Sequence, residues 1–206
     1  MSARDEILAR VARSLADRPR PAPVPRHYRR TGPPGVDAVA LFAERAADYR
    51  ATVERVEPPG LPAAVAAALA GRGARRVVVP AGLPADWLAA ADVTTEYDDP
   101  PLSTAELDST DGVVTGAALA IAETGTIVLD AGVAQGRRAL TLLPDFHLCV
   151  VRADQIVASV PEGIARLDPR RPQTWISGPS ATSDIELNRV EGVHGPRNLH
   201  ILILDI

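Results

Sequence analysis

Lysine is absent from this 206-residue chain, in which all 22 basic residues are arginine. No side chain can therefore form a Schiff base with a carbonyl substrate, act as the lysine of a Walker A phosphate loop, or activate a serine in a Ser–Lys pair. Cysteine is nearly absent as well, because Cys149 is the sole thiol. A single thiol excludes an internal disulfide and an internal iron–sulfur cluster held by four thiolates.

Aromatic residues make up only 3% of the chain, whereas hydrophobic residues of all kinds make up 46%. The core is therefore expected to be aliphatic, and the length fits one large α/β domain with a small N-terminal appendage. The formal net charge of −4 gives no general drive toward nucleic acid or an acidic membrane surface. No apolar run is long enough to span a bilayer or to form a signal peptide, which predicts a cytoplasmic protein.

Residues 1–35 are expected to form an N-terminal helix and a Pro/Arg-rich arm outside the main domain. The helix is predicted over residues 3–17, where Ile7, Leu8 and Val11 share one face and Ser2 is placed to cap the first turn. Residues 18–35 contain six prolines and five arginines but no acidic residue, which favours an extended conformation. This arm is either a solvated linker or a device that docks the first helix onto a partner subunit.

Residues 36–206 alternate between helical and strand-like patterns, which indicates an α/β domain with a mostly parallel sheet flanked by helices. Two strand-like runs, 112–121 and 126–129, are joined so tightly that they must be antiparallel, so the sheet is expected to be mixed. Ser103 and Glu106 have the spacing of a capping box before a short helix. Further strands are predicted at 52–56, 76–80, 146–151, 174–177 and 199–204, and further helices at 37–50, 62–70, 86–91, 137–143, 157–167 and 183–189.

A candidate anion site follows the predicted strand at 174–177, where the chain breaks at Gly178 and continues with the hydroxyl residues Ser180, Thr182 and Ser183. The spacing of Ser183 and Glu186 is that of a capping box and predicts the start of a helix. Free backbone N–H groups and the helix dipole at such a start can hold a small carboxylate or phosphate.

His194 is the better of two histidine candidates, because it lies in a glycine-rich loop where an imidazole is accessible and titrates near neutral pH. His147 is expected to be a hydrogen-bonded histidine at the start of a strand, and Cys149 to fill the core. The histidines and the single cysteine show none of the spacings of metal ligands, so no metal is expected.

Three further features each allow a functional and a structural interpretation. Glu123 lies in a tight turn and is a candidate base or nucleophile, or it simply accepts hydrogen bonds from nearby backbone N–H groups. Arg137 and Arg138 precede a helical run and form either an anion clamp or a surface pair facing solvent. Asp130 ends a strand and is equally compatible with a plain turn.

Taken together, the segments at 121–126, 142–147, 178–186 and 192–196 resemble the LUD domain family, and the resemblance covers residues 36–206. The most specific part is Gly-Pro-Ser at 178–180 followed by His-Gly-Pro at 194–196. The resemblance implies a fold like that of the NagB/RpiA/CoA-transferase group. It also implies a role in oxidising L-lactate to pyruvate beside two iron–sulfur partner proteins, with this cysteine-poor chain as the component that carries no cofactor.

Two hypotheses follow. In the first, the chain is an accessory or ligand-binding subunit without its own redox centre. In the second, it is an enzyme acting on a small phosphorylated or acyl-activated carboxylate, with Glu123 as base or nucleophile and His194 as acid/base. The second requires Glu123, the turn at 178–183 and His194 to converge at the carboxyl ends of the parallel strands. Whether the chain forms a homo-oligomer is left open by the sequence.

Overall fold

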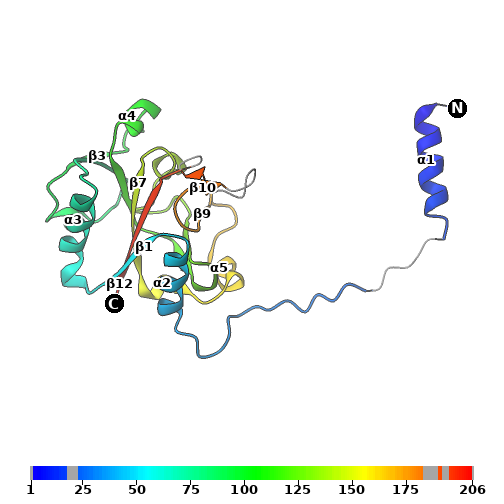
Figure 1. Cartoon of the computed structure of the whole chain (residues 1–206), viewed down its shortest axis with the longest axis horizontal. Coiled ribbons are helices and arrows are strands. Elements are labelled where there is room, and N and C mark those ends of the chain that lie inside the picture. Colours follow the sequence, from blue (N-terminus) through cyan, green and yellow to red (C-terminus); the bar gives the residue numbers. More distant parts are fainter. Residues whose placement is uncertain (1, 18–22, 183–189, 192–194, 206) are drawn as a thin grey trace.

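The computed structural model describes residues 2–17, 23–182, 190–191 and 195–205 of the chain. Within them, strands form a six-stranded sheet in the order β1-β12-β7-β4-β2-β3, a four-stranded sheet in the order β8-β5-β6-β9, and the pair β10-β11 (Figure 1). The larger sheet consists of β1 (Thr52–Val56), β2 (Arg76–Val79), β3 (Thr94–Tyr97), β4 (Gly112–Thr115), β7 (Phe146–Arg152) and β12 (Asn198–Leu204). The others are β5 (Leu119–Ile121), β6 (Thr126–Leu129), β8 (Ile156–Val157), β9 (Thr174–Ile176), β10 (Ala181–Thr182) and β11 (Val190–Glu191).

The expected single mixed sheet is corrected by the structure, because every pairing in the six-stranded sheet is parallel. The antiparallel pair β5–β6 exists as predicted, but it belongs to the second sheet. The run at 112–121 is therefore two strands. The chain leaves the first sheet after β4, where the Gly116 N–H donates to Ala134 O, and joins the second when the Ala118 N–H donates to Val128 O.

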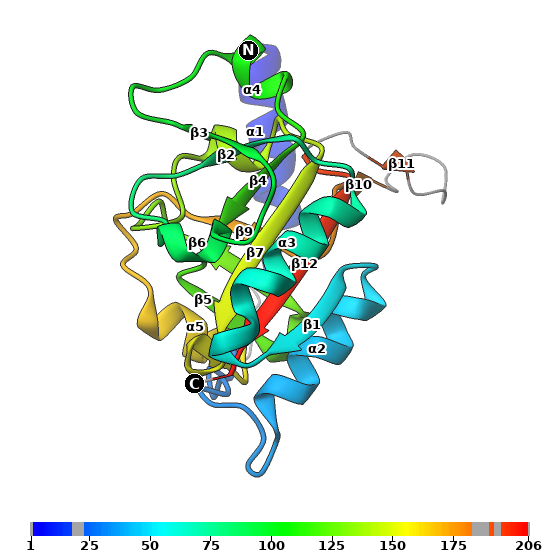
Figure 2. The ribbon, with the colours of Figure 1, turned by 90° about the vertical axis from the view of Figure 1, so that its left-hand side faces the viewer.

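The centre of the larger sheet is buried on both faces, as crossover connections require of parallel strands. Successive side chains of a strand point to opposite faces, so Ile201 and Ile203 of β12 pack with Phe42 of α2 (Ala38–Asp48) and with the second sheet. Leu202 and Leu204 pack on the other face, which α3 (Leu61–Gly71) covers (Figure 2). The core is aliphatic as expected, since Phe42 and Phe146 are the aromatic residues among its buried members in the described part of the chain.

Several connections are shorter than their sequence patterns predicted. The helices expected at 86–91 and 137–143 are 3₁₀ turns, η2 (Ala85–Leu88) and η4 (Arg138–Thr141). The helix expected at 157–167 is α5 (Val160–Arg166), because residues 156–157 form the short strand β8 instead. The capping box of Ser103 and Glu106 is confirmed at the start of α4 (Thr104–Asp108). The remaining 3₁₀ turns are η1 (Pro58–Gly60), η3 (Ala122–Thr124) and η5 (Ala153–Gln155).

The predicted N-terminal helix is present as α1 (Ala3–Ser14), with Ser2 and Asp5 forming a capping box. None of its residues is buried, and Figure 1 shows α1 standing apart from the α/β body. Residues 23–30 have no regular secondary structure. Among the described helices, none combines the length and apolar character that crossing a membrane requires.

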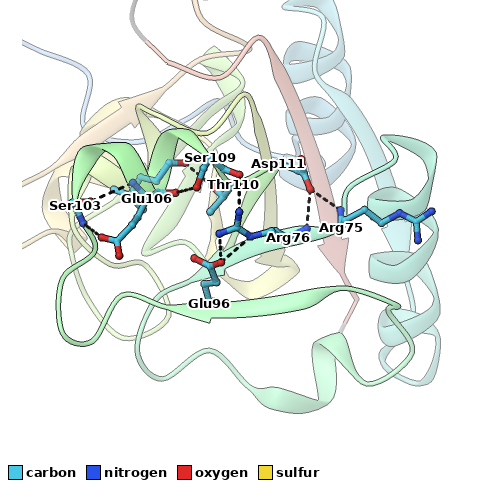
Figure 3. Close-up of polar contacts among 9 residues, drawn as sticks. Arg75, Arg76, Glu96, Ser103, Glu106, Ser109, Thr110 and Asp111 are labelled. Carbon is cyan, nitrogen blue, oxygen red and sulfur yellow. Dashed lines mark hydrogen bonds and ion pairs between the residues drawn. The ribbon is translucent and has the colours of Figure 1, made fainter.

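A polar network ties the amino ends of β2 and β4 together (Figure 3). The carboxylate of Asp111, just before β4, accepts the backbone N–H groups of Arg75 and Arg76 at 2.7 and 2.8 Å. Side chains of Arg76 and Glu96 then form an ion pair that joins β2 to β3. The backbone N–H groups of Arg75 and Arg76 lower the pKa of Asp111, because they bind the ionised carboxylate best.

We expect Asp111→Ala to lower the free energy of unfolding by about 1–2 kcal/mol at pH 7, a range that allows for solvent exposure of these hydrogen bonds. Because the folded pKa is depressed, this contribution is present above the unfolded pKa of about 3.9 and is lost as the pH falls through the folded pKa. Urea denaturation at several pH values measures it. Asp108→Ala, at the end of α4, is the control and should change stability by under about 0.5 kcal/mol. A difference between wild type and Asp111→Ala that does not shrink in acid would contradict this assignment.

Candidate functional site

Glu123 is held in place by hydrogen bonds to both carboxylate oxygens. It lies in η3, between β5 and β6, where Oε1 accepts the N–H of Val160 at 2.8 Å. Oε2 accepts Nη2 of Arg29, from the N-terminal arm, at 2.5 Å. Glu123 therefore joins the arm to the start of α5, as the structural interpretation of this turn expects. A catalytic role for Glu123 stays a prediction.

The arm contacts the body at a second point close by. A Cβ on Gly32 would lie 2.5 Å from Cβ of Ala158, so the arm backbone packs directly on the segment before α5. Burial raises the pKa of Glu162, but hydrogen bonds from Ser159 and from the Gly32 N–H outweigh it and hold this pKa below its usual range. The end of the arm is thus docked rather than free in solvent.

A hollow of ≈ 440 Å³ lies beside Glu123 and reaches the segment that enters Gly178. Thr126 Oγ1 is 2.7 Å from Thr124 Oγ1 and 2.7 Å from Ser177 Oγ, so three hydroxyls connect the two segments. The residues lining it are Arg45, Tyr49, Glu123, Thr124, Thr126, Val160, Trp175 and Ser177. The structure therefore brings two of the predicted motifs, the Glu123 turn and the strand end before Gly178, to one hollow.

The segment after Gly178 forms a turn and then a short strand. Gly178 has a φ of +81°, and the Ser180 N–H donates to Pro196 O at 2.8 Å. The chain then enters β10, which includes Thr182 and pairs with β11. Ser183, the predicted helix at 183–189 and His194 lie outside the described residues.

The described part of this block lies at the amino edge of the six-stranded sheet. Pro196 precedes β12, and Arg197 Nε donates to Oδ1 of Asp145, which precedes β7, at 2.6 Å. Figure 2 shows β10 and β11 at the end of the sheet away from the C-terminus. The described part of the turn therefore does not meet the requirement of the second hypothesis, because Ser180 contacts a residue that leads into β12.

The predicted arginine pair lines one hollow, but Arg137 is engaged by a neighbouring carboxylate. Arg137 donates to both carboxylate oxygens of Asp98, at 2.7 and 2.9 Å, and to Leu102 O at 2.6 Å. The hydrogen bond to Asp98 raises the pKa of Arg137. With these bonds the Arg137 side chain holds the loop after β3 in place. Arg137 and Arg138 both line a hollow of ≈ 410 Å³, together with Gly136 and Pro172. Because the Arg137 guanidinium already binds both oxygens of Asp98, the structure does not favour an anion clamp formed by Arg137 and Arg138 together.

His147 and Cys149 have the structural roles that their strand pattern predicted. His147 is fully buried and bonded through Nε2 to Thr115 Oγ1 at 2.8 Å, and burial lowers its pKa to about 4. Cys149 is buried beside it on β7, and burial raises the pKa of its thiol to about 12. In the described part of the chain, no three His, Cys, Asp or Glu side chains gather as a metal site would require.

A cleft of ≈ 610 Å³ lies at the carboxyl edge of the six-stranded sheet, which we call the carboxyl-edge cleft. Gly82 follows β2 and Gly116 follows β4, so it opens between two neighbouring parallel strands. From β2 the chain moves outward to β3, whereas the next strand of this sheet after β4 is β7, on the opposite side. The gap between β2 and β4 is therefore the topological switch point of the sheet. Open parallel sheets bind ligands at such points. Its polar lining is formed by Asp130, Gln135, Arg152, Asp154, Gln155, Arg166 and Arg171.

The loop after β6 forms one wall of this cleft and has an unusual backbone. Ala131 and Ala134 have φ values of 56° and 62°, a region that alanine seldom adopts. The Asp130 N–H donates to Gln135 Oε1 at 2.6 Å, and the Gly132 N–H donates to Asp130 Oδ1 at 3.1 Å. Nonglycine residues held in this region are often found at functional sites. No sequence motif marked this wall beyond a plain turn at Asp130.

Comparison with known proteins identifies the family and the relatives of this chain. The LUD domain model matches residues 103–204. The chain is 51% identical over 207 residues to lactate utilization protein C of Deinococcus radiodurans, covering 97% of this chain and 94% of that protein. It is 40% identical to YkgG of Escherichia coli over 93 residues, which is 41% of this chain and 40% of that one. A crystal structure of a DUF162 family protein from Deinococcus radiodurans matches with a TM-score of 0.69 and 47% identity, covering 82% of this chain and 96% of that chain.

Gly178→Ala tests the close approach at the amino edge. A Cβ there would lie 2.6 Å from Tyr49 O, whereas a Cβ on Gly73, whose φ of +68° is similar, meets nothing within 4 Å. We expect Gly73→Ala to cost about 1 kcal/mol of unfolding free energy for backbone strain alone. Gly178→Ala should cost about 1–3 kcal/mol more because of the collision. Equal losses in thermal or urea denaturation would show that Tyr49 does not constrain this position.

Glu123→Gln tests the docked arm. The amide keeps an acceptor for the Val160 N–H but loses the charge that pairs with Arg29. An exposed ion pair is worth about 0.2–1 kcal/mol, so trypsin should cleave at Arg29 and Arg30 up to about fivefold faster. Mass spectrometry of a limited digest measures these rates. The control is Glu57→Gln, at the start of η1. Equal cleavage rates for Glu123→Gln and Glu57→Gln would contradict the docking of the arm through Glu123.

Proposed function

This chain belongs to the LUD domain family and is a homologue of lactate utilization protein C, and we propose that it is a component of a system that oxidises L-lactate to pyruvate. Its role there is that of an accessory or ligand-binding subunit. The observation that carries the proposal is the 51% identity to lactate utilization protein C over 97% of the chain.

The thiol content of the chain supports an accessory role. Oxidation of L-lactate to pyruvate releases two electrons and two protons, and the electrons need a carrier. A four-thiolate iron–sulfur cluster is excluded here, since Cys149 is the only cysteine and is buried in β7. We therefore propose that iron–sulfur proteins of the same system accept the electrons.

The N-terminal appendage supports contact with a partner. Residues 1–35 are proposed as an attachment device separate from the LUD-like domain at 36–206. The apolar face of α1, formed by Ile7, Leu8 and Val11, is exposed, as is the C-cap residue Leu15. Amphipathic helices of this kind bind by laying the apolar face into a groove of another protein. The arm is docked on the body through Arg29, so a partner bound by α1 would be tethered to this body.

A second candidate is an enzyme like those of the NagB/RpiA/CoA-transferase group, acting on a small phosphorylated or acyl-activated carboxylate. The hollow that holds Glu123 beside three hydroxyls favours it. Two observations weigh against it. Both oxygens of Glu123 already accept hydrogen bonds, and the described turn at Gly178 lies at the amino edge of the sheet.

Deleting the gene tests the first candidate. We expect the deletion strain to lose growth on L-lactate as sole carbon source and to grow normally on glucose, with growth restored by the wild-type gene. Normal growth on L-lactate would contradict the proposal. Glu123→Gln discriminates between the candidates in the same strain, because full complementation excludes catalysis by Glu123. Failed complementation with wild-type levels of folded protein favours the enzyme if Arg29→Gln, which breaks the same ion pair, still complements.

A further inference from the structure

We propose that the carboxyl-edge cleft binds a small organic carboxylate, with Arg171 and Gln135 holding the anionic group. The inference rests on the proposed ligand-binding role and names the site and the ligand class. It is carried by the convergence of polar atoms at Gly132, by two donors without partners, and by the charge balance of the lining.

Three side chains direct polar atoms at the same small volume beside Gly132. A Cβ on Gly132 would lie 2.8 Å from Oδ1 of Asp130, 2.9 Å from Nη2 of Arg171 and 3.0 Å from Nε2 of Gln135. Glycine keeps this volume open, because any larger residue would collide with all three. The atoms come from two segments, the loop after β6 and the chain before β9, so tertiary structure brings them together.

Both nitrogen donors at this point are free to bind a ligand. Oε1 of Gln135 accepts the Asp130 N–H, and since that N–H can only donate, the amide must turn its Nε2 the other way. Nη1 of Arg171 pairs with Asp130 Oδ2 at 3.1 Å, which leaves Nη2 available. Across the described residues neither Nε2 nor Nη2 has a hydrogen-bond acceptor. Gln135 is only 6% exposed and its Oε1 is bonded, so its side chain is held in one position at the wall of the cleft.

The charges of the cleft favour a ligand with one negative charge. Its lining contains three arginines and two aspartates. Arg152 pairs with Asp154 at 3.0 Å and Arg171 pairs with Asp130. Arg166 has no carboxylate partner in the described structure, and donates only to the backbone oxygen of Asp154 at 3.5 Å. One positive charge is therefore uncompensated, which matches a monocarboxylate.

Other residues that line the cleft are apolar and suit the carbon skeleton of such an acid. They include Trp87, Leu119, Val150 and Leu167. Apolar walls with a few convergent polar groups are the usual composition of small-molecule sites. The volume of ≈ 610 Å³ exceeds what a three-carbon acid fills, so acids of different length must be compared.

Trp87 provides a direct reporter of binding, because Trp175 is the only other tryptophan. In Trp175→Phe protein, the fluorescence of Trp87 is titrated with pyruvate, L-lactate, hexanoate and inorganic phosphate. We expect a saturable change with at least one carboxylate, and the tightest one identifies the chain length. No saturable change with any carboxylate, or a change with phosphate at equal or lower concentration, would overturn the proposal.

Matched variants in the same background locate the binding. Gln135→Glu keeps an acceptor for the Asp130 N–H but replaces the Nε2 donor with a negative oxygen, and should weaken binding at least about tenfold. Arg171→Gln should do the same, and Gly132→Ala should block the site with a methyl group. The control is Arg170→Gln, whose side chain is 93% exposed, and it should bind as wild type does.

If Arg170→Gln and Arg171→Gln weakened binding equally, surface charge alone would explain the binding. That result would overturn the proposed site. Gly132→Ala keeps the test decisive if Arg171→Gln fails to fold, as circular dichroism would show. Because binding is measured on the isolated protein, a negative result here leaves the growth result untouched. A positive binding result with normal growth of the deletion strain would instead reject the lactate role alone.

Discussion

Parallel pairing of β7 and β12 is the constraint on which the rest of the structure depends. Seven residue pairs, from Asn198 opposite Phe146 to Leu204 opposite Arg152, place both strands in the same direction at the centre of the sheet. All six strands then end at one edge, where the carboxyl-edge cleft opens. Segments that lead into these strands gather at the other edge, so a residue's place before or after a strand determines which site it can join.

This constraint explains which predictions from sequence succeeded. Patterns within one element were sufficient to predict the central strands, α2, α3 and the capping box at Ser103. They also predicted the buried roles of His147 and Cys149. The division into two sheets depends on hydrogen bonds of Gly116 and Ala118 to distant residues, which no local pattern encodes. The same is true of the cleft, since Arg171 and Gln135 are far apart in sequence and meet only at Gly132.

The predicted site residues belong to two different surroundings. Glu123 is bonded to the arm and to α5, which gives the Pro/Arg-rich segment a docking point on the body that composition alone could not predict. Gly178 and Ser180 lie at the amino edge, next to the start of β12. Family membership is consistent with all these residues, but the geometry favours the opposite edge for a ligand. The proposed accessory role and the proposed ligand of the cleft are compatible, since a subunit that binds a carboxylate would leave electron transfer to partner proteins.

The most direct measurement is an amide NMR titration of the full chain with a monocarboxylate such as pyruvate. The account predicts saturable shifts for the amides of Gly132, Gln135 and Gly116 at the carboxyl edge, with little change at Gly178 and Ser180. Shifts centred on Gly178, Ser180 and the Glu123 turn would contradict it, since they would place the ligand at the amino edge and in the hollow beside Glu123.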